Sequence, residues 1–133
     1  LVGGSNHGSL AQSHLEWTLE TIRGGTNTSL TVVAYDNAEF HPKTMHIVRA
    51  DGTEVAVVGS ANLTDSGLGL NVEATLAIDT AAGDDPEVAQ QIAAAIDRWR
   101  GVDEEGVFHV ENEDDISDLK VARIIDEVQP ARP

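Results

Sequence analysis

The sequence predicts a single α/β domain in which short strands and amphipathic helices alternate. Three observations predict this class: short runs of β-branched residues, longer segments with apolar residues at helical spacing, and turn residues between them. The 133 residues suffice for one domain with its own core, and we expect one domain over residues 1–133. The chain begins with Leu1 in a strand-like segment, which is compatible with its being a piece of a longer polypeptide.

In the first half of the chain, a helix and a hairpin carry the clearest signals. Gly24-Gly25 supplies a stop for the helix. Asp51-Gly52 joins two strand-like runs, and both residues tolerate the positive φ angles of a tight hairpin turn. The expected elements are a strand end at 1–2 with a turn at 3–6, a helix at 9–23, a buried strand at 29–35, and hairpin strands at 44–49 and 54–59.

In the second half, the strongest helix begins after Asp84-Asp85. These residues form an acidic cap, Pro86 stands in the first turn, and Gly101 supplies the stop. The expected elements are a loop at 63–70 with one helical turn at 64–66, a strand at 72–78, a helix from 84 to 101, a short strand at 106–110, and an amphipathic helix at 114–127 with Ile116, Leu119, Ile124 and Ile125 on its apolar side.

The chain is strongly acidic. It has 23 Asp and Glu residues against 8 Lys and Arg residues, which gives a formal net charge of −15. Self-repulsion on this scale is easiest to tolerate where salt shortens the Debye length to about 3 Å, near 1 M. We therefore expect a salt-adapted, halophilic protein, with an ordinary acidic protein as the alternative.

Composition also excludes several classes of site. The chain has no cysteine, so it forms neither a disulfide framework nor a thiolate metal site. It shows no apolar run of about 18 residues and no pattern of a signal peptide at its start. We expect a soluble, cytoplasmic protein without a membrane partner.

One constellation of residues has the composition of a catalytic site. His41 and Lys43 stand two residues apart, and so do Ser60 and Asn62, so each pair shares a face of an extended segment. Pairing through the Asp51-Gly52 turn would bring the two pairs together, and Glu73 follows at the next strand. An imidazole, a fixed cation, neutral donors and a carboxylate suit attack on a phosphodiester.

These residues resemble the signature of the phospholipase D superfamily: His-x-Lys, then Gly-Ser-x-Asn, then an acidic residue. The amino-acid sequence at residues 40–43, 59–64 and 71–73 is most similar to that of the branch of restriction endonucleases and helicase-linked nucleases. The resemblance implies a mixed β-sheet flanked by helices on both faces, and a phosphodiesterase, most simply a nuclease that acts on DNA.

The resemblance also implies a two-step mechanism that needs no metal or other cofactor. His41 would attack phosphorus to form a phosphohistidine, and His41 of a second copy would protonate the leaving oxygen. Lys43, Ser60 and Asn62 would bind the substrate phosphate and stabilise its charge, while Glu73 would orient the imidazole. Because one chain carries one signature, we expect a homodimer with a shared site, or a second copy in a missing part of the chain.

The signature departs from the family pattern at one position, and two other functions stay open. The family often has an acidic residue where this chain has Val48, and the nearby Asp51 is better explained as a turn former. We assign His46 a structural or surface role, and Asn71 either shares a face with Glu73 or has a role in a turn or at the entry of a strand. The alternatives are a phospholipase or phosphatidyltransferase, and an inactive module for dimerisation or nucleic-acid binding.

Overall fold

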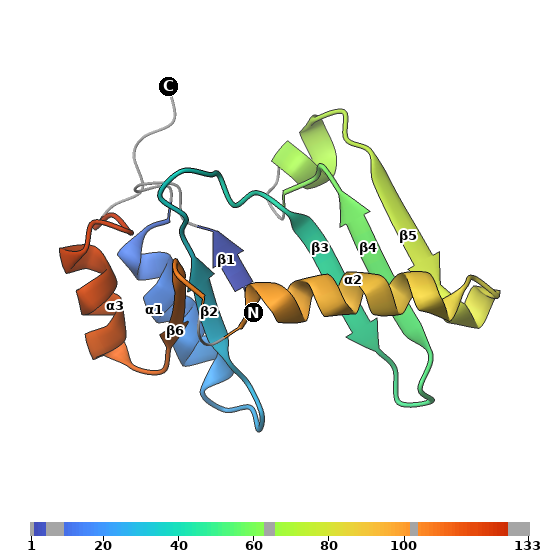
Figure 1. Ribbon diagram of the computed structural model, residues 1–133, viewed down its shortest axis with the longest axis horizontal. Coiled ribbons are helices and arrows are strands. Elements are labelled where there is room, and N and C mark those ends of the chain that lie inside the picture. The colour runs from blue at the N-terminus through green and yellow to red at the C-terminus, as the bar shows by residue number, and fades with distance from the viewer. Residues whose placement is uncertain (1, 5–9, 63–65, 102–103, 128–133) are drawn as a thin grey trace. The chain divides into compact units, whose positions relative to one another are not determined.

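The computed structural model describes residues 2–4, 10–62, 66–101 and 104–127, which form two compact units. Unit 1 comprises Leu1–Phe40 and Trp99–Pro133, and unit 2 comprises His41–Arg98. Helices and strands are interspersed along the chain, with three consecutive strands in its first half (Figure 1), which confirms the α/β class. The strands form two separate three-stranded sheets, one in each unit.

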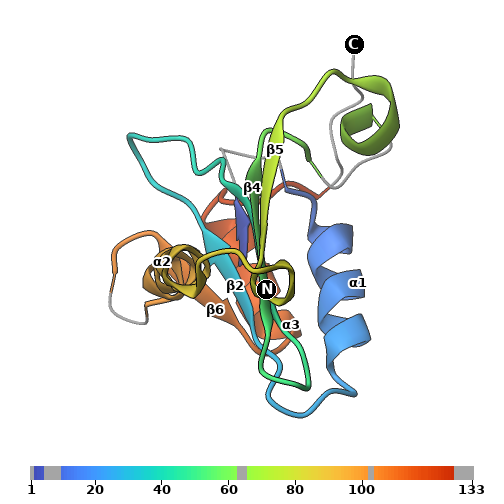
Figure 2. The ribbon, with the colours of Figure 1, turned by 90° about the vertical axis from the view of Figure 1, so that its right-hand side faces the viewer.

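Unit 1 is built on a mixed sheet. Strand β2 (Leu30–Val33) lies in the centre, parallel to β1 (Val2–Gly4) and antiparallel to β6 (Val107–Val110). Helices α1 (Gln12–Ile22) and α3 (Glu113–Val121) pack on this sheet (Figure 2). Apolar side chains from α1, α3, β2, β6 and the segment that follows α3 form the core: Leu15, Leu19, Leu30, Val32, Val110, Ile116, Leu119 and Ile125.

The prediction of a turn at residues 3–6 is wrong for residues 3 and 4. Gly3 and Gly4 continue β1 and pair with Val32 and Val33 of β2, while residues 5–6 lie outside the described part. Pairing with a central strand overrides the low strand preference of glycine, which is a weak local tendency.

The last helix is shorter than expected. Helix α3 ends at Val121, whereas the apolar pattern predicted a helix to residue 127. The amide of Arg123 donates to the Lys120 carbonyl at 2.9 Å and that of Ile124 to the Leu119 carbonyl at 2.9 Å, which is the Schellman arrangement for ending a helix. The apolar residues beyond it are still used, because Ile125 is 2% exposed and belongs to the core.

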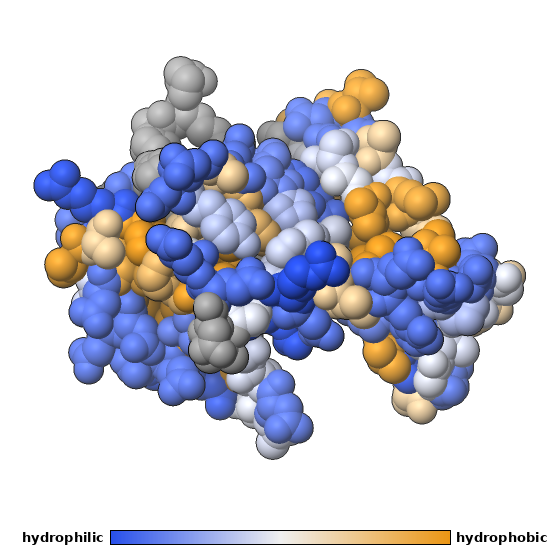
Figure 3. All heavy atoms as spheres, in the orientation of Figure 1, coloured by the Kyte–Doolittle hydropathy of each residue, from blue (hydrophilic) through white to orange (hydrophobic). Residues whose placement is uncertain are grey.

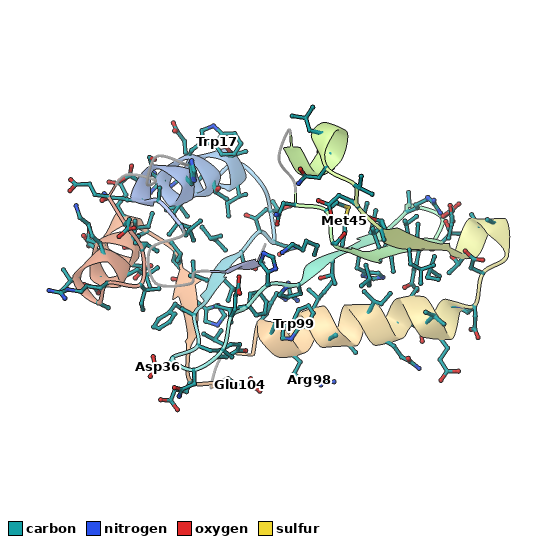
Figure 4. The ribbon with its side chains drawn as sticks, turned by 90° about the horizontal axis from the view of Figure 1, so that it is seen from above. Trp17, Asp36, Met45, Arg98, Trp99 and Glu104 are labelled. Carbon is teal, nitrogen blue, oxygen red and sulfur yellow. The ribbon has the colours of Figure 1, made fainter. Side chains whose placement is uncertain are left out.

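Unit 2 is an antiparallel sheet with one long helix. Strands β3 (Lys43–Val48), β4 (Glu54–Gly59) and β5 (Thr75–Asp79) pair in that order, and the short helix η2 (Thr80–Ala82) leads towards α2 (Pro86–Trp99). Helix α2 runs along one face of this sheet (Figure 4). Ala56 in β4 and Ala89 in α2 are fully buried. His46 is paired with Ala56, so the preceding residue, Met45, points to the opposite face of the sheet, where it is 40% exposed.

The β3-β4 hairpin forms as the Asp51-Gly52 pair predicts. Gly52 has a φ of 84°, and the Asp51 carboxylate accepts hydrogen bonds from the amide and the hydroxyl of Thr53 at 2.9 and 2.7 Å. These bonds lower the pKa of Asp51. The turn-forming role of Asp51 is therefore confirmed. His46 also has a structural contact, since its Nε2 lies 2.8 Å from Oε2 of Glu54.

An ion pair at the turn end of the sheet gives a testable pH dependence. The Arg49 guanidinium donates to both carboxylate oxygens of Asp79, at 2.8 and 2.7 Å, and this pair lowers the pKa of Asp79 to about 2. A carboxyl whose pKa is lower in the folded state stabilises the fold above its unfolded pKa of about 4, and this contribution is lost as the pH falls through about 2.

We expect Asp79→Asn to lower the melting temperature by a few degrees at pH 7, a modest effect because the pair is partly exposed and screened by salt. The difference from the wild type should shrink between pH 4 and pH 2, which melting curves followed by circular dichroism would measure. Asp118→Asn is the control at an exposed carboxylate of α3. An undiminished difference at pH 2 would contradict the assigned cause.

No helix among the described residues combines the length and the apolar character that crossing a membrane requires.

Candidate functional site

The signature residues lie at one end of the β3-β4-β5 sheet. Lys43, at the start of β3, is paired with Gly59 at the end of β4, and Gly59 is paired in turn with Thr75 at the start of β5. His41, Ser60 and Glu73 lie on the chain just outside these three strand ends. The hairpin therefore brings His-x-Lys and Gly-Ser-x-Asn side by side, as the Asp51-Gly52 turn predicts.

Gly59 is required where the three strands meet. A Cβ atom there would lie 2.8 Å from the Ala74 carbonyl oxygen and 3.0 Å from the Thr75 Cα, and closer still to the Thr75 hydroxyl. The close approach lets the Ser60 amide donate to the Ala74 carbonyl at 3.0 Å. The glycine of the signature thus holds the end of β4 tightly against the start of β5.

Lys43 and His41 are joined through the backbone. The Lys43 ammonium donates to the His41 carbonyl oxygen at 2.9 Å. Lys43 is half-buried and His41 is exposed, so the imidazole is on the surface of unit 2 with a cation beside its own peptide group. A substrate phosphate bound to this ammonium would come close to His41.

Ser60 and Asn71 hold the carboxylate of Glu73. The Ser60 hydroxyl donates to Oε2 at 2.5 Å and accepts from the Ala74 amide at 3.1 Å, while the Asn71 side-chain amide donates to Oε1 at 3.2 Å. The single hydroxyl hydrogen of Ser60 is used by Glu73. In this structure Ser60 therefore positions the carboxylate, and it would have to change partners to donate to a phosphate.

The same contacts keep Glu73 ionised. The hydrogen bond from Ser60 has the largest effect in lowering the pKa of Glu73, the bond from Asn71 and the charge of Lys43 act in the same direction, and partial burial opposes them. The half-buried carboxylate is a fixed acceptor for the proton of a neighbouring group, which is the chemistry expected of a residue that orients an imidazole.

Asn62 is positioned by a glycine of the following segment. The π-helical turn η1 (Ser66–Leu70) brings Gly67 against the Asn62 backbone, where a Cβ atom would lie 2.9 Å from the Asn62 nitrogen and closer still to its carbonyl oxygen. The Asn62 side chain is exposed, as phosphate binding requires. The helical turn expected at residues 64–66 falls mostly outside the described part, because residues 63–65 are not described.

Two contributors to this site carry only weak signals in the sequence. Asn71 could be found because it stands two residues before Glu73, although a turn was an equal expectation. The role of Gly67 depends on a close approach between segments that sequence spacing does not reveal. In the described residues, no cluster of three or more His, Asp and Glu side chains is placed to hold a metal ion.

Comparison with known proteins gives one finding. A family model described as "Cardiolipin synthase, PLD-like domain" matches residues 1–100 of the 133, which include all five signature residues. Neither a curated protein nor a solved structure matches the chain.

Proposed function

The chain belongs to the phospholipase D superfamily through this PLD-like domain, a phosphodiesterase-type domain, and from this premise we propose that it is a nuclease that hydrolyses DNA. One observation supports the proposal above others: the Lys43–Gly59 pairing brings His41, Lys43, Ser60, Asn62 and Glu73 to one end of one sheet. An intact set of these groups argues against a module that only dimerises or binds.

In the proposed reaction, an imidazole nitrogen of His41 forms a bond to phosphorus and the P–O bond to the leaving strand breaks. His41 of a second copy gives its proton to the leaving oxygen and then takes one from the attacking water, whose oxygen displaces the first imidazole. Lys43 and Asn62 stabilise the charge on the non-bridging oxygens. Glu73 positions an imidazole, and the Ser60 hydroxyl keeps the Glu73 carboxylate in place by its hydrogen bond. No cofactor takes part.

The proposed second copy is supported by an apolar surface beside the site. Leu68, Leu70 and Val72 lie immediately before Glu73, and they are 68%, 80% and 103% exposed. Figure 3 shows apolar surface over η1 and β5. Contiguous exposed apolar side chains are typical of surfaces that associate. We propose that a homodimer covers them and joins two signatures in one site.

The acidic composition fits DNA only at high salt. A net charge of −15 repels a polyanion, and this repulsion is screened when the Debye length falls to about 3 Å. We therefore propose a halophilic, cytoplasmic enzyme whose activity on DNA rises with KCl concentration, the reverse of the usual salt dependence of DNA binding.

A second candidate is an enzyme that acts on a phospholipid headgroup. The exposed Leu68, Leu70 and Val72 beside the site favour it, since an enzyme on lipid needs an apolar surface near its reacting groups. The acidic surface disfavours it for anionic lipids.

The test is cleavage of single- and double-stranded DNA, a small phosphodiester and phosphatidylglycerol vesicles, all in EDTA, at about 0.1 M and about 2 M KCl. We expect cleavage of DNA that persists in EDTA and is faster at the higher salt concentration. Turnover of the vesicles without cleavage of DNA would favour the lipid candidate. No turnover of any substrate by the folded protein would contradict both.

A further inference from the structure

Unit 1 contains a cavity of about 490 Å³ that no signature residue lines. Its walls come from three segments: residues 34–38 after β2, residues 105–108 at the start of β6, and residues 122–124 after α3. A volume of this order is typical of small-molecule sites in proteins. Two backbone features maintain it. Gly106 has a φ of 84° and its carbonyl accepts from the Ala34 amide at 2.8 Å, and Tyr35 bridges to Ala38 around a tight turn.

The lining combines flat apolar ring faces with polar groups, including side chains of negative and of positive charge. Tyr35 and Phe108 supply aromatic rings, Asp36 and Asn37 stand at the tip of the turn, and Arg123 supplies a cation. Asp36 is exposed, and its side chain projects to the outside of unit 1 (Figure 4). Proteins bind unstacked nucleobases by stacking aromatic rings on them and by hydrogen bonds with nearby amide, carboxylate and guanidinium groups.

Arg123 is the most informative of these residues. It occupies the left-handed position that ends α3, with a φ of 58°, where glycine is the usual residue because a side chain adds strain. Among the described residues, its guanidinium has neither a hydrogen bond nor an ion pair. A strained position that carries a long cation, and lines a cavity, suggests that the side chain is used for binding.

The cavity is also close to His41 along the chain. Ala38 precedes His41 by three residues, so the extended chain limits the separation of their Cα atoms to about 11 Å. The Tyr35 ring meets the Phe40 ring edge-on, with centroids 6.1 Å apart, and Phe40 directly precedes His41. A ligand in the cavity would thus touch the segment that leads to the attacking imidazole.

We propose that this cavity binds one unstacked nucleotide of the strand that is cut. Its base lies against Tyr35 and Phe108, the Asn37 side-chain carbonyl accepts a hydrogen bond from the base, and Arg123 binds its phosphate. This inference rests on the proposed function, because it assigns a recognition site to the same substrate. It also predicts that single-stranded DNA is bound in preference to a duplex, whose bases are stacked.

The first test uses a single-stranded trinucleotide and the same trinucleotide with an abasic central position, titrated at high salt into the His41→Ala protein, which cannot turn over. Amide NMR shifts report the affinity and the place of binding. We expect shifts at Ala34 and Gly106, and an affinity about tenfold lower for the abasic ligand. Equal affinities, or shifts that avoid the cavity, would overturn the proposal.

The second test is Arg123→Gly in the same background. Removing the strained side chain should raise the melting temperature while the affinity for the trinucleotide falls about tenfold, a combination that a purely structural role does not produce. Arg98→Gln, which removes a cation outside the cavity, should leave the affinity within twofold. A more stable Arg123→Gly protein that binds as before would overturn the proposal.

The two proposals can fail separately. Cleavage of DNA by the wild type, together with unchanged binding in Arg123→Gly, would contradict the cavity site alone. Binding that depends on the base and on Arg123 would support the cavity site even if the wild type cleaved no DNA, and the nuclease activity would then be the proposal that failed.

Discussion

Replacing His41 by alanine is expected to lower the rate of DNA cleavage at least about a thousandfold, because removal of a covalent nucleophile leaves only binding and electrostatic stabilisation. Protein folding and dimer formation should not change, since the His41 side chain is exposed in unit 2 and the carbonyl that accepts from Lys43 belongs to the backbone. Single-turnover cleavage at high salt measures the loss, and sedimentation measures the dimer. His14→Ala, another exposed histidine, is the matched control.

Mixing the two proteins tests whether the site is shared. If both copies of His41 serve one site, only wild-type dimers are active, and activity at fixed total protein follows the square of the wild-type fraction. An equal mixture that has exchanged subunits should then keep roughly one quarter of the activity, against one half for independent sites. A linear dependence on the wild-type fraction would contradict the shared site, and full activity in His41→Ala would contradict the nucleophile.

The hairpin and the order of the signature were predictable because their signals are local. Asp51-Gly52 requires neither a partner strand nor a core to form its turn, and the turn then fixes which residues of β3 and β4 pair. The register itself pairs Lys43 with Gly59, and the other signature residues lie just outside the ends of β3 and β4. The family model matches residues 1–100, a range that includes this segment.

The end of α3 could not be predicted, because the residue that ends it breaks the usual rule. A helix that ends in the left-handed conformation usually has glycine there, and this chain has Arg123. The apolar pattern continued through Ile124 and Ile125, so it extended the predicted helix to residue 127. Ile125 is buried in the segment that follows α3. There Asp126 forms an isolated β-bridge with Ala11, which links the N-terminal and C-terminal parts of unit 1.

The start of β5 shows the same limit within the site. A strand was expected from residue 72, yet β5 begins at Thr75 and Val72 is fully exposed. The preceding residues are engaged in the contacts of Glu73 with Asn71 and Ser60. The Ser60–Glu73 hydrogen bond depends on the pairing of Gly59 with Thr75 across β4 and β5. The sequence at these two positions does not predict that register. The role of Glu73 in orienting His41 stays a prediction.

Gly67→Ala is expected to lower cleavage about a hundredfold, the scale of loss that a displacement of about 1 Å causes in a catalytic group. The added methyl group would meet the Asn62 backbone, lying 2.9 Å from its nitrogen, and backbone atoms cannot yield as the end of a flexible side chain can. The Asn62 amide would therefore move away from the phosphate although its own side chain is unchanged. Single-turnover rates compared with those of Asn62→Ala would measure the effect.

Gly69→Ala is the matched control in the same π-helical turn. Outside the turn itself, no atom of the described residues lies within 4 Å of the position of its added Cβ, so cleavage should stay within twofold and the melting temperature should not fall. A partial loss of stability in Gly67→Ala alone would not explain a large loss of rate at a temperature where both variants are folded. If the two alanine variants cleaved DNA equally well, the positioning of Asn62 by Gly67 would be wrong. If Gly67→Ala and Asn62→Ala lost similar amounts of activity, the close approach of the two backbones would be the reason that the site needs glycine there.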